Sequence, residues 1–383
     1  MSESFVSTMS LPEFSLWKKM ESKRVLISFD LEVTARCNNN CRHCYINLPA
    51  GDKLVEDKEL CFEEIKEIVN EAASLGALWC LITGGEPLLR DDFFDIYLYL
   101  KRKGLLVSVF TNGTLITEEH VKLFKKYPPR DIEVSVYGVT EETYECVTRR
   151  RGSYAAFTRG LELLLGSGVG LRLKAMAMRS NIHELADIAR FCRRYTKDYF
   201  RFDPLVHLRY DGDALRNAEI RAERLTPEEI VTIEHADEER FTALTRNCAK
   251  LTDTQFGHIR CGHLFHCGAG NSSFALSNNG LFRLCPSLWH PDCVYDLTKG
   301  NLIDAWQSFV PRVRDMRSER KEFLEKCGVC PLINLCLWCP AHAHLETGET
   351  DAPVDYFCQT AHARAEGLRG TGGLTTELES NAL

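Results

Sequence analysis

The 383-residue chain lacks a long apolar run, an excess of positive charge and an apolar segment near its N-terminus. No stretch approaches the roughly 18 consecutive apolar residues that a membrane-spanning helix requires, which excludes such a helix. Lys and Arg number 47 against 54 Asp and Glu, so the net charge of −7 provides no positive field for nucleic acid or an anionic membrane. Residues 1–23 are polar and do not resemble a secretory signal. We therefore expect a cytoplasmic protein without nucleic-acid or membrane partners.

Cysteine, by contrast, is abundant, with 17 residues. A reducing cytoplasm argues against a disulfide framework, so metal binding is the leading explanation. Three cysteines form the pattern Cys37-x3-Cys41-x2-Cys44, and eight others, not counting the isolated Cys293, fall in the stretch from Cys261 to Cys358. The other six are isolated, and we expect them to be small buried apolar residues: Cys61, Cys80, Cys146, Cys192, Cys248 and Cys293.

Between these two groups, short apolar strands alternate with amphipathic helices. Phe29, Leu31 and Val33 alternate with polar residues, a period of two that predicts a strand leading into Cys37. Such alternation favours a parallel sheet covered by helices, and six units are too few for a closed eight-stranded barrel. Further strands are predicted at 78–83, 105–110, 132–137, 171–178 and 200–206, and helices at 62–73, 91–102, 117–126, 153–165 and 181–195.

The first cysteine group follows the first strand, and ligands bind at the carboxyl ends of strands in parallel α/β folds. Three thiolates can hold three irons of a [4Fe–4S] cluster and leave the fourth iron open. A zinc site needs four ligands, and His43 is the candidate for the fourth. The residues alone leave iron–sulfur and zinc open, with iron–sulfur favoured.

Four motifs, each at a predicted strand end, together resemble the radical S-adenosylmethionine (radical SAM) enzymes. They are Cys37-x3-Cys41-x2-Cys44 followed by Tyr45, Thr83-Gly84-Gly85-Glu86-Pro87, Thr111-Asn112-Gly113, and Ser135-Val136-Tyr137-Gly138. In the last motif Tyr137 replaces the usual acid. The resemblance covers residues 25–206 and implies an α/β fold, a partial (β/α)6 TIM-like barrel.

The resemblance also implies a cofactor site. Cys37, Cys41 and Cys44 would hold the SAM cluster, whose open iron chelates the amine and carboxylate of S-adenosylmethionine. The SAM-binding residues would be Gly84, Gly85, Glu86, Pro87, Asn112, Ser135 and Arg149. Reductive cleavage of SAM would yield a 5′-deoxyadenosyl radical that abstracts a hydrogen atom from the substrate, and an external donor such as flavodoxin or ferredoxin would supply the electron.

The C-terminal cysteines resemble the SPASM domain, a cysteine-rich extension of certain radical SAM enzymes. Zinc sites of four thiolates are the alternative interpretation of such pairs. By resemblance, auxiliary cluster I would use Cys261, Cys267, Cys285 and Cys339, and auxiliary cluster II would use Cys327, Cys330, Cys336 and Cys358, which makes three [4Fe–4S] clusters in all. A hairpin is predicted from 274–276 and 281–284, with Gly280 supplying the positive φ of its turn.

SPASM enzymes mostly modify peptides or proteins, so we expect a peptide or protein substrate and an oxidative thioether or carbon–carbon crosslink. An auxiliary cluster could accept the second electron of such a reaction. Pro286, Ser287 and Leu288 stand where formylglycine-forming relatives have an aspartate, which argues against the sulfatase-maturase alternative. About 24 residues precede the first strand, too few for a leader-binding module, so we expect either a separate leader-binding protein or a substrate without a leader. A tetrapyrrole or haem-biosynthesis enzyme is the other enzymatic alternative, and a zinc-binding scaffold is the non-enzymatic one.

We predict five segments in the chain. They are an N-terminal extension (1–24), the radical SAM partial barrel (25–207), a helical bridge (208–258) with a capping box at Thr226, the SPASM auxiliary-cluster domain (259–366) and a disordered tail (367–383).

Overall fold

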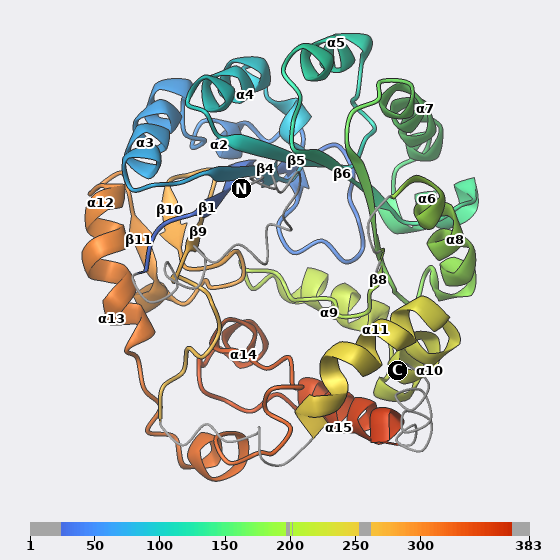
Figure 1. The fold of residues 1–383 in the computed structure, drawn as a ribbon, viewed down its shortest axis with the longest axis vertical. Coiled ribbons are helices and arrows are strands. Elements are labelled where there is room, and N and C mark those ends of the chain that lie inside the picture. The colour runs from blue at the N-terminus through green and yellow to red at the C-terminus, as the bar shows by residue number, and fades with distance from the viewer. Residues whose placement is uncertain (1–23, 197–199, 201, 253–261, 370–383) are drawn as a thin grey trace, which may run out of the picture.

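The computed structural model describes residues 24–196, 200, 202–252 and 262–369. Within them, nine strands form one sheet in the order β11-β10-β9-β1-β4-β5-β6-β7-β8. Figure 1 shows this sheet curving around the upper part of the molecule, with helices on its outer side and α9 and α14 below it. A second sheet of two short strands, β2 (Arg36–Cys37) and β3 (Leu48–Pro49), brackets the cysteine loop.

Six parallel strands form the predicted partial barrel, and each lies close to its predicted position. In β1 the apolar residues Phe29 and Leu31 are buried toward the helices, whereas Asp30 and Glu32 face the other side, the barrel interior. The last strand is much shorter than predicted, because its pairing with β7 is limited to two residues. The bounds are β1 Ser28–Thr34, β4 Trp79–Gly84, β5 Leu106–Thr111, β6 Asp131–Val136, β7 Leu171–Met176 and β8 Phe202–Asp203.

The outer helices cover one face of the barrel, and α6 is a helix that the apolar pattern did not predict. The helical spacing of apolar residues is weak in α6, because Thr143 and Thr148 are among the residues that it buries. The short helix α2 was not predicted either, whereas α3, α4, α5, α7 and α8 agree with prediction to within a few residues. The bounds are α2 Lys53–Glu56, α3 Phe62–Ser74, α4 Phe93–Arg102, α5 Glu118–Lys126, α6 Glu141–Thr148, α7 Ser153–Leu165 and α8 Leu185–Tyr195, with short η2 Pro87–Leu89 and η3 Ile182–Glu184.

The predicted hairpin is present as β9 (Ser273–Leu276) and β10 (Leu281–Arg283), with Gly280 at φ +83°. It does not stand apart from the barrel, because β9 pairs in parallel with β1, Leu31 opposite Leu276. A third strand, β11 (Val294–Asp296), pairs antiparallel with β10. The hairpin therefore covers the edge of β1, which a partial barrel would otherwise leave unpaired.

The described part of the segment predicted as a bridge contains helices α9, α10 and α11, and Thr226 caps α10 with Glu229 in a capping box. The predicted tail begins too early, since α15 continues to Arg369 with Leu368 packed against Leu332 and Leu335. The rest of the tail and residues 1–23 lie outside the described residues. The bounds are α9 Ala214–Glu223, α10 Pro227–Ala236, α11 Glu238–Cys248, η4 Ala249–Thr252, η6 Pro291–Cys293, α12 Leu302–Asp304, η7 Ala305–Phe309, α13 Val310–Arg314, η8 Phe323–Cys327, α14 Pro340–Thr347 and α15 Asp355–Arg369.

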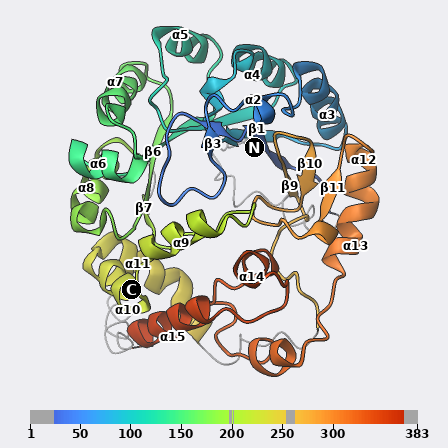
Figure 2. The ribbon, with the colours of Figure 1, turned by 180° about the vertical axis from the view of Figure 1, so that it is seen from behind.

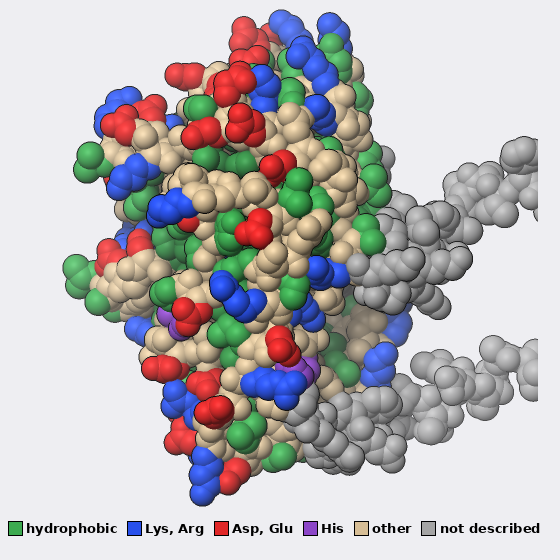
Figure 3. All heavy atoms as spheres, turned by 90° about the vertical axis from the view of Figure 1, so that its left-hand side faces the viewer, with side chains coloured by type: hydrophobic (Ala, Val, Ile, Leu, Met, Phe, Trp, Pro, Cys, Tyr) green, Lys and Arg blue, Asp and Glu red, His purple; other side chains and the backbone are tan. Residues whose placement is uncertain are grey.

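The face formed by α3, α12 and α13 carries acidic and basic side chains interspersed, as Figure 3 shows. Figure 2, the view from behind, shows α9 passing between the barrel and α14. No helix among the described residues is long and apolar enough to cross a membrane.

Candidate active site and metal centres

Cys37, Cys41 and Cys44 lie together on the loop after β1. Burial raises the pKa of Cys37 to about 12, and the charges of Glu86 and Cys44 add to it. The pKa of Cys41 is raised by burial and by both other thiols. Three neighbouring thiols, of which Cys41 is buried and Cys37 and Cys44 are partly buried, suit a cationic ligand, because metal binding replaces their protons. This donor set fits the [4Fe–4S] cluster that the sequence predicts.

Backbone contacts hold this loop against α6. The N–H groups of Asn40 and Arg42 donate to the carbonyl oxygens of Thr148 (2.9 Å) and Val147 (3.0 Å), at the C-terminal end of α6. Carbonyl oxygens at the end of a helix have no hydrogen-bond partner inside that helix. Here the N–H groups of the cysteine loop are their partners.

Two arginines from the α9 region hold the loop from its other side. Arg216 donates to the carbonyl of Cys41 at 2.9 Å. The buried Arg209 donates to the carbonyls of Cys44 (3.4 Å) and Asn47 (3.1 Å). The segment after β8 therefore fixes the loop after β1, although about 170 residues of chain separate them.

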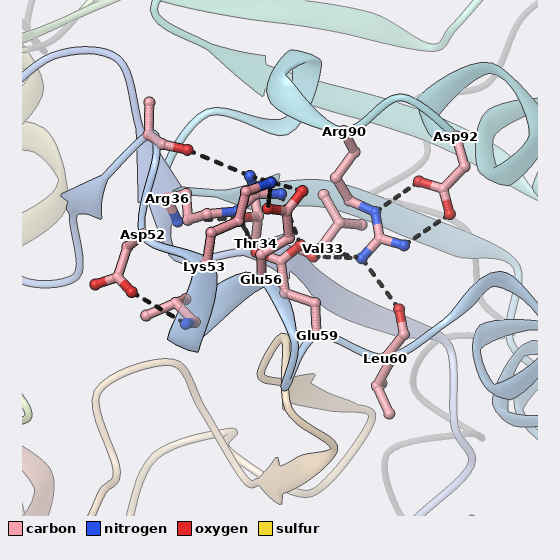
Figure 4. Close-up of polar contacts among 12 residues, drawn as sticks. Val33, Thr34, Arg36, Asp52, Lys53, Glu56, Glu59, Leu60, Arg90 and Asp92 are labelled. Carbon is pink, nitrogen blue, oxygen red and sulfur yellow. Dashed lines mark hydrogen bonds and ion pairs between the residues drawn. The ribbon is translucent and has the colours of Figure 1, made fainter.

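A buried ion-pair network supports the start of the loop, as Figure 4 shows. Arg36, immediately before Cys37, makes two hydrogen bonds to Glu59, at 2.9 and 3.0 Å. Glu59 also accepts from Thr34 and pairs with Arg90 at 3.6 Å. Arg90 donates in turn to the carbonyl oxygens of Val33 and Leu60, each at 3.0 Å. Sequence reasoning missed this network, because its members are ordinary charged residues without a motif.

Gly84 and Gly85 allow backbone to pack on backbone. A Cβ on Gly84 would lie 2.1 Å from the carbonyl oxygen of Thr34, and one on Gly85 would lie 2.2 Å from that of Arg36. Gly84 also has φ +134°, which other residues rarely adopt. Gly84 and Gly85 therefore pack closely against the end of β1 and the start of the cysteine loop. This backbone contact fixes the end of β4 relative to the cysteine loop.

Glu86 is fully buried and joins two loops. Its carboxylate accepts from the Asn112 N–H (2.7 Å), the Thr111 hydroxyl (2.8 Å) and the Leu88 N–H (3.2 Å). Burial raises its pKa to about 7, and these hydrogen bonds oppose the rise. Both carboxylate oxygens thus have protein partners, and the structure gives Glu86 a positioning role beside the buried Pro87.

Asn112 lies at the cysteine loop. Its amide nitrogen donates to Asn38 (2.8 Å) and approaches the sulfur of Cys37 at 3.7 Å. The Asn39 N–H also points to that sulfur, at 3.4 Å. N–H groups directed at a cluster thiolate tune its redox potential.

Ser135 and Tyr137 lie on the same side of the loop. Tyr137 is hydrogen-bonded to Cys41 and to Ser135, and its ring meets that of His43 edge to face at 5.1 Å. Burial lowers the pKa of His43 to about 4. Tyr137, which replaces the acid of the motif, therefore packs directly on a predicted cluster ligand.

The structure gives Arg149 a partner that the sequence did not indicate. Its guanidinium pairs with Glu219 of α9 at 2.9 Å, and its backbone ends α6 in the left-handed conformation. Its neighbour Arg150 points toward the site instead, with contacts of 3.4 Å to Asn39 and to Thr114.

Three C-terminal thiols gather near the hairpin. Burial raises the pKa of Cys339 to about 12, and Cys285 and Cys267 contribute to the rise. Cys267 likewise contributes to the raised pKa of Cys285. Cys339 therefore lies with cysteines more than 50 positions away. Cys261, the fourth predicted ligand of auxiliary cluster I, lies outside the described residues.

The other four thiols form a second group. Burial raises the pKa of Cys336 to about 12, with contributions from Cys358, Cys327 and Cys330. The pKa values of Cys327, about 11, and Cys358 rise for the same reasons, burial and then Cys330. All sixteen described cysteines are free thiols. In the part of the chain that the structure describes, no three Cys, His, Asp or Glu side chains form a site for a single metal ion.

Residues 31–192 match the Radical SAM superfamily. Over 332 residues the chain is 24% identical to an AdoMet-dependent heme synthase of Methanosarcina barkeri, a match that covers 83% of this chain and 92% of that protein. It is 26% identical to the antilisterial bacteriocin subtilosin biosynthesis protein AlbA of Bacillus subtilis, over 80% of this chain and 70% of that protein.

The fold is similar to that of Streptococcus suis SuiB bound to S-adenosylmethionine, with a TM-score of 0.64 at 14% identity. This match covers 94% of this chain and 83% of SuiB. SuiB bound to its precursor peptide SuiA gives a TM-score of 0.62. The likeness includes the C-terminal cysteine region, so the predicted α/β partial barrel with a cysteine-rich C-terminal part is confirmed.

Proposed function

We propose that this chain, whose residues 31–192 match the radical SAM superfamily of enzymes, modifies a peptide or protein substrate and introduces an oxidative thioether or carbon–carbon crosslink. Bound S-adenosylmethionine and its [4Fe–4S] cluster supply the abstraction of a hydrogen atom from the substrate. The observation that carries the proposal is the likeness of nearly the whole chain to SuiB, which is known in complex with a precursor peptide. AlbA, a second relative over most of the chain, is named for bacteriocin biosynthesis.

In this proposal the chain's own residues hold and orient the cofactors. Cys37, Cys41 and Cys44 ligate the SAM cluster, and Gly84–Pro87, Asn112 and Ser135 shape the SAM site around it. Arg149 stays a proposed SAM contact that would have to exchange Glu219 for the cofactor carboxylate. Arg150, directed at Asn39 and Thr114, is an additional candidate for that carboxylate.

The two groups of C-terminal thiols support two auxiliary [4Fe–4S] clusters with the predicted ligand sets. Cys339 lies near Cys285 and Cys267, whereas its sequence neighbour Cys336 lies near Cys327, Cys330 and Cys358. We further propose a cytoplasmic location, where thiols stay reduced, with flavodoxin or ferredoxin as electron donor and a separate leader-binding protein as partner.

Metal analysis of paired cysteine variants tests both the clusters and their ligand sets. After anaerobic reconstitution we expect about twelve irons and matching sulfide, falling to about eight in a Cys37/Cys41/Cys44→Ala variant. A double variant with Cys267→Ala and Cys339→Ala should lose about four irons, because both cysteines are predicted ligands of the same cluster. Cys267→Ala combined with Cys336→Ala should lose about eight.

The exposed Cys61→Ala is the matched control and should retain all iron. Two zincs with negligible sulfide would overturn the proposal in favour of a zinc scaffold. With iron in place, release of 5′-deoxyadenosine on addition of candidate peptides tests the substrate class.

A tetrapyrrole is the second candidate substrate, favoured by the heme synthase relative. A cavity of about 370 Å³ is lined by Arg240 and Arg364, which could meet an acidic ligand, and also by Asp203. Both arginines, however, donate to the buried Glu234 at 2.8 Å. Titration with a carboxylated iron porphyrin, monitored through the porphyrin's Soret band, distinguishes the peptide substrate from the tetrapyrrole. If the substrate is a peptide, we expect the position of the Soret band not to change.

A further inference from the structure

A cavity of about 220 Å³ lies between the barrel and the C-terminal region. Two of its walls come from segments that follow the carboxyl ends of the parallel strands β1 and β8, and a third comes from the segment after β10, which runs antiparallel to β9. Tyr45 lies in the cysteine loop after β1, Leu208 and Tyr210 follow β8, and Trp289 follows β10. Leu345 of α14 closes it. In parallel α/β folds this is the side on which chemistry takes place. We refer to it below as the aromatic cavity.

Trp289 is held rigidly at the edge of this cavity. The ring of Tyr210 stacks on it with centroids 4.2 Å apart, and the guanidinium of Arg283 lies 3.6 Å from its centroid. Two groups this close must occupy opposite faces of the indole. A ligand in the cavity therefore meets the indole at its edge.

Two nitrogen atoms of residues that line the cavity have no hydrogen-bond partner among the residues that the structure describes. They are Nε1 of Trp289 and Nδ1 of His207, both buried. Buried polar atoms are normally hydrogen-bonded, and leaving one unpaired costs about 1–3 kcal/mol. A peptide group offers the complement, a carbonyl oxygen for the indole N–H and an N–H or carbonyl for the imidazole nitrogen, whose role depends on its tautomer.

Size and charge restrict the occupant further. The cavity is smaller than the roughly 300–1,000 Å³ of pockets for drug-sized ligands, so it accommodates one large side chain with its peptide group rather than a macrocycle. Tyr45, Leu208 and Leu345 supply apolar surface. The nearby cation, Arg283, is fully buried and pairs with Glu32 at 2.6 Å, so it is already neutralised.

Resting on the proposed function, we propose that the aromatic cavity binds one large apolar residue of the peptide substrate, with Trp289 donating to a carbonyl oxygen of that residue. The cavity lies between Tyr45, next to the ligand Cys44, and Trp289, four residues after Cys285. A residue seated there is presented beside the radical centre, so the cavity selects which part of the peptide reacts.

Capped amino acids test this assignment on the reconstituted holoenzyme with SAM, under anaerobic conditions. We expect N-acetyl-phenylalanine amide and N-acetyl-leucine amide to bind at least tenfold more tightly than N-acetyl-alanine amide in ligand-observed NMR. Leu345→Phe, which fills the cavity, and Tyr210→Ala should each weaken binding of the phenylalanine probe at least tenfold. Trp289→Phe keeps the ring but removes the donor and should weaken it about fivefold.

Tyr127→Ala, at an exposed tyrosine on α5's C-terminal end, is the matched control and should bind like wild type. Circular dichroism and iron content show whether each variant is folded and loaded. Equal binding of the alanine and phenylalanine probes, or full binding by a folded Leu345→Phe variant, would overturn the assignment.

The two proposals fail in different ways. If the probes bind as expected but no peptide stimulates 5′-deoxyadenosine release, the cavity stands and the proposed function fails. If peptides without large apolar residues are modified as readily as those with them, the function stands and the cavity assignment fails.

Discussion

At Gly85 a Cβ atom would lie 2.2 Å from the carbonyl oxygen of Arg36 and 2.6 Å from that of Ala35. No side chain can move to relieve this contact, because both neighbours are backbone. The φ of Gly85 is not positive, so the requirement for glycine is steric alone. Glycine in this motif therefore serves first to join the second strand end to the cysteine loop.

We predict that Gly85→Ala destabilises the protein by about 2–3 kcal/mol, as overpacking against fixed atoms does. Urea unfolding of the apoprotein under reducing conditions measures the change. Gly51→Ala is the control, since nothing lies within 4 Å of a Cβ there, and it should stay within about 0.5 kcal/mol of wild type. Equal stability of the two variants would contradict the contact.

At the scale of elements, α15 is attached to the bridge by one carboxylate. Glu234 of α10 accepts from Arg240 at 2.8 Å and from Arg364 of α15 at 2.8 and 2.9 Å. All three side chains are buried or nearly so. Since α15 also carries Cys358, this ion network positions one ligand of the proposed auxiliary cluster II.

We predict that Glu234→Gln costs about 3–5 kcal/mol, because it leaves two buried guanidinium groups without a counter-charge. The free energy of unfolding of the apoprotein measures the loss. The exposed Glu228→Gln, in the same helix, should cost only a few tenths of a kcal/mol. A Glu234 variant as stable as the control would show that apolar contacts alone dock α15.

At the scale of the whole molecule, one ion pair joins the barrel to the C-terminal region. Glu32 of β1 and Arg283 of β10 are 1% and 0% exposed, and Arg283 also donates to the carbonyl of Pro286. Their strands lie two apart in one sheet, connected through β9. The pair therefore links the two halves of the fold beneath the aromatic cavity.

We predict that Arg283→Met and Glu32→Gln each cost about 3–5 kcal/mol, because each strands a buried charge. The double variant should cost less than the sum of the two, since it removes both charges. A double-mutant cycle in urea measures this coupling, and strict additivity would contradict a direct interaction.

The sequence by itself determined most of the barrel. The period-two pattern of Phe29, Leu31 and Val33, and the helical spacing of residues such as Ile65 and Val69, reflect which side faces the core, and that is local information. The motifs around Cys37 and Gly84 are also local, and they identified the family correctly. The ligand sets of the auxiliary clusters stay predictions, supported by the gathering of their thiols.

Only the tertiary structure decided which distant segments meet. The pairing of β9 with β1, the ion pair of Glu32 with Arg283 across 251 positions, and the partner of Arg149 all depend on chain paths that periodicity does not encode. The sequence shows that an apolar or charged residue needs a partner when it is buried, but it does not show which residue that partner is. The physical reason is that burial is decided locally, whereas the choice among buried partners is made by the packing of the whole molecule.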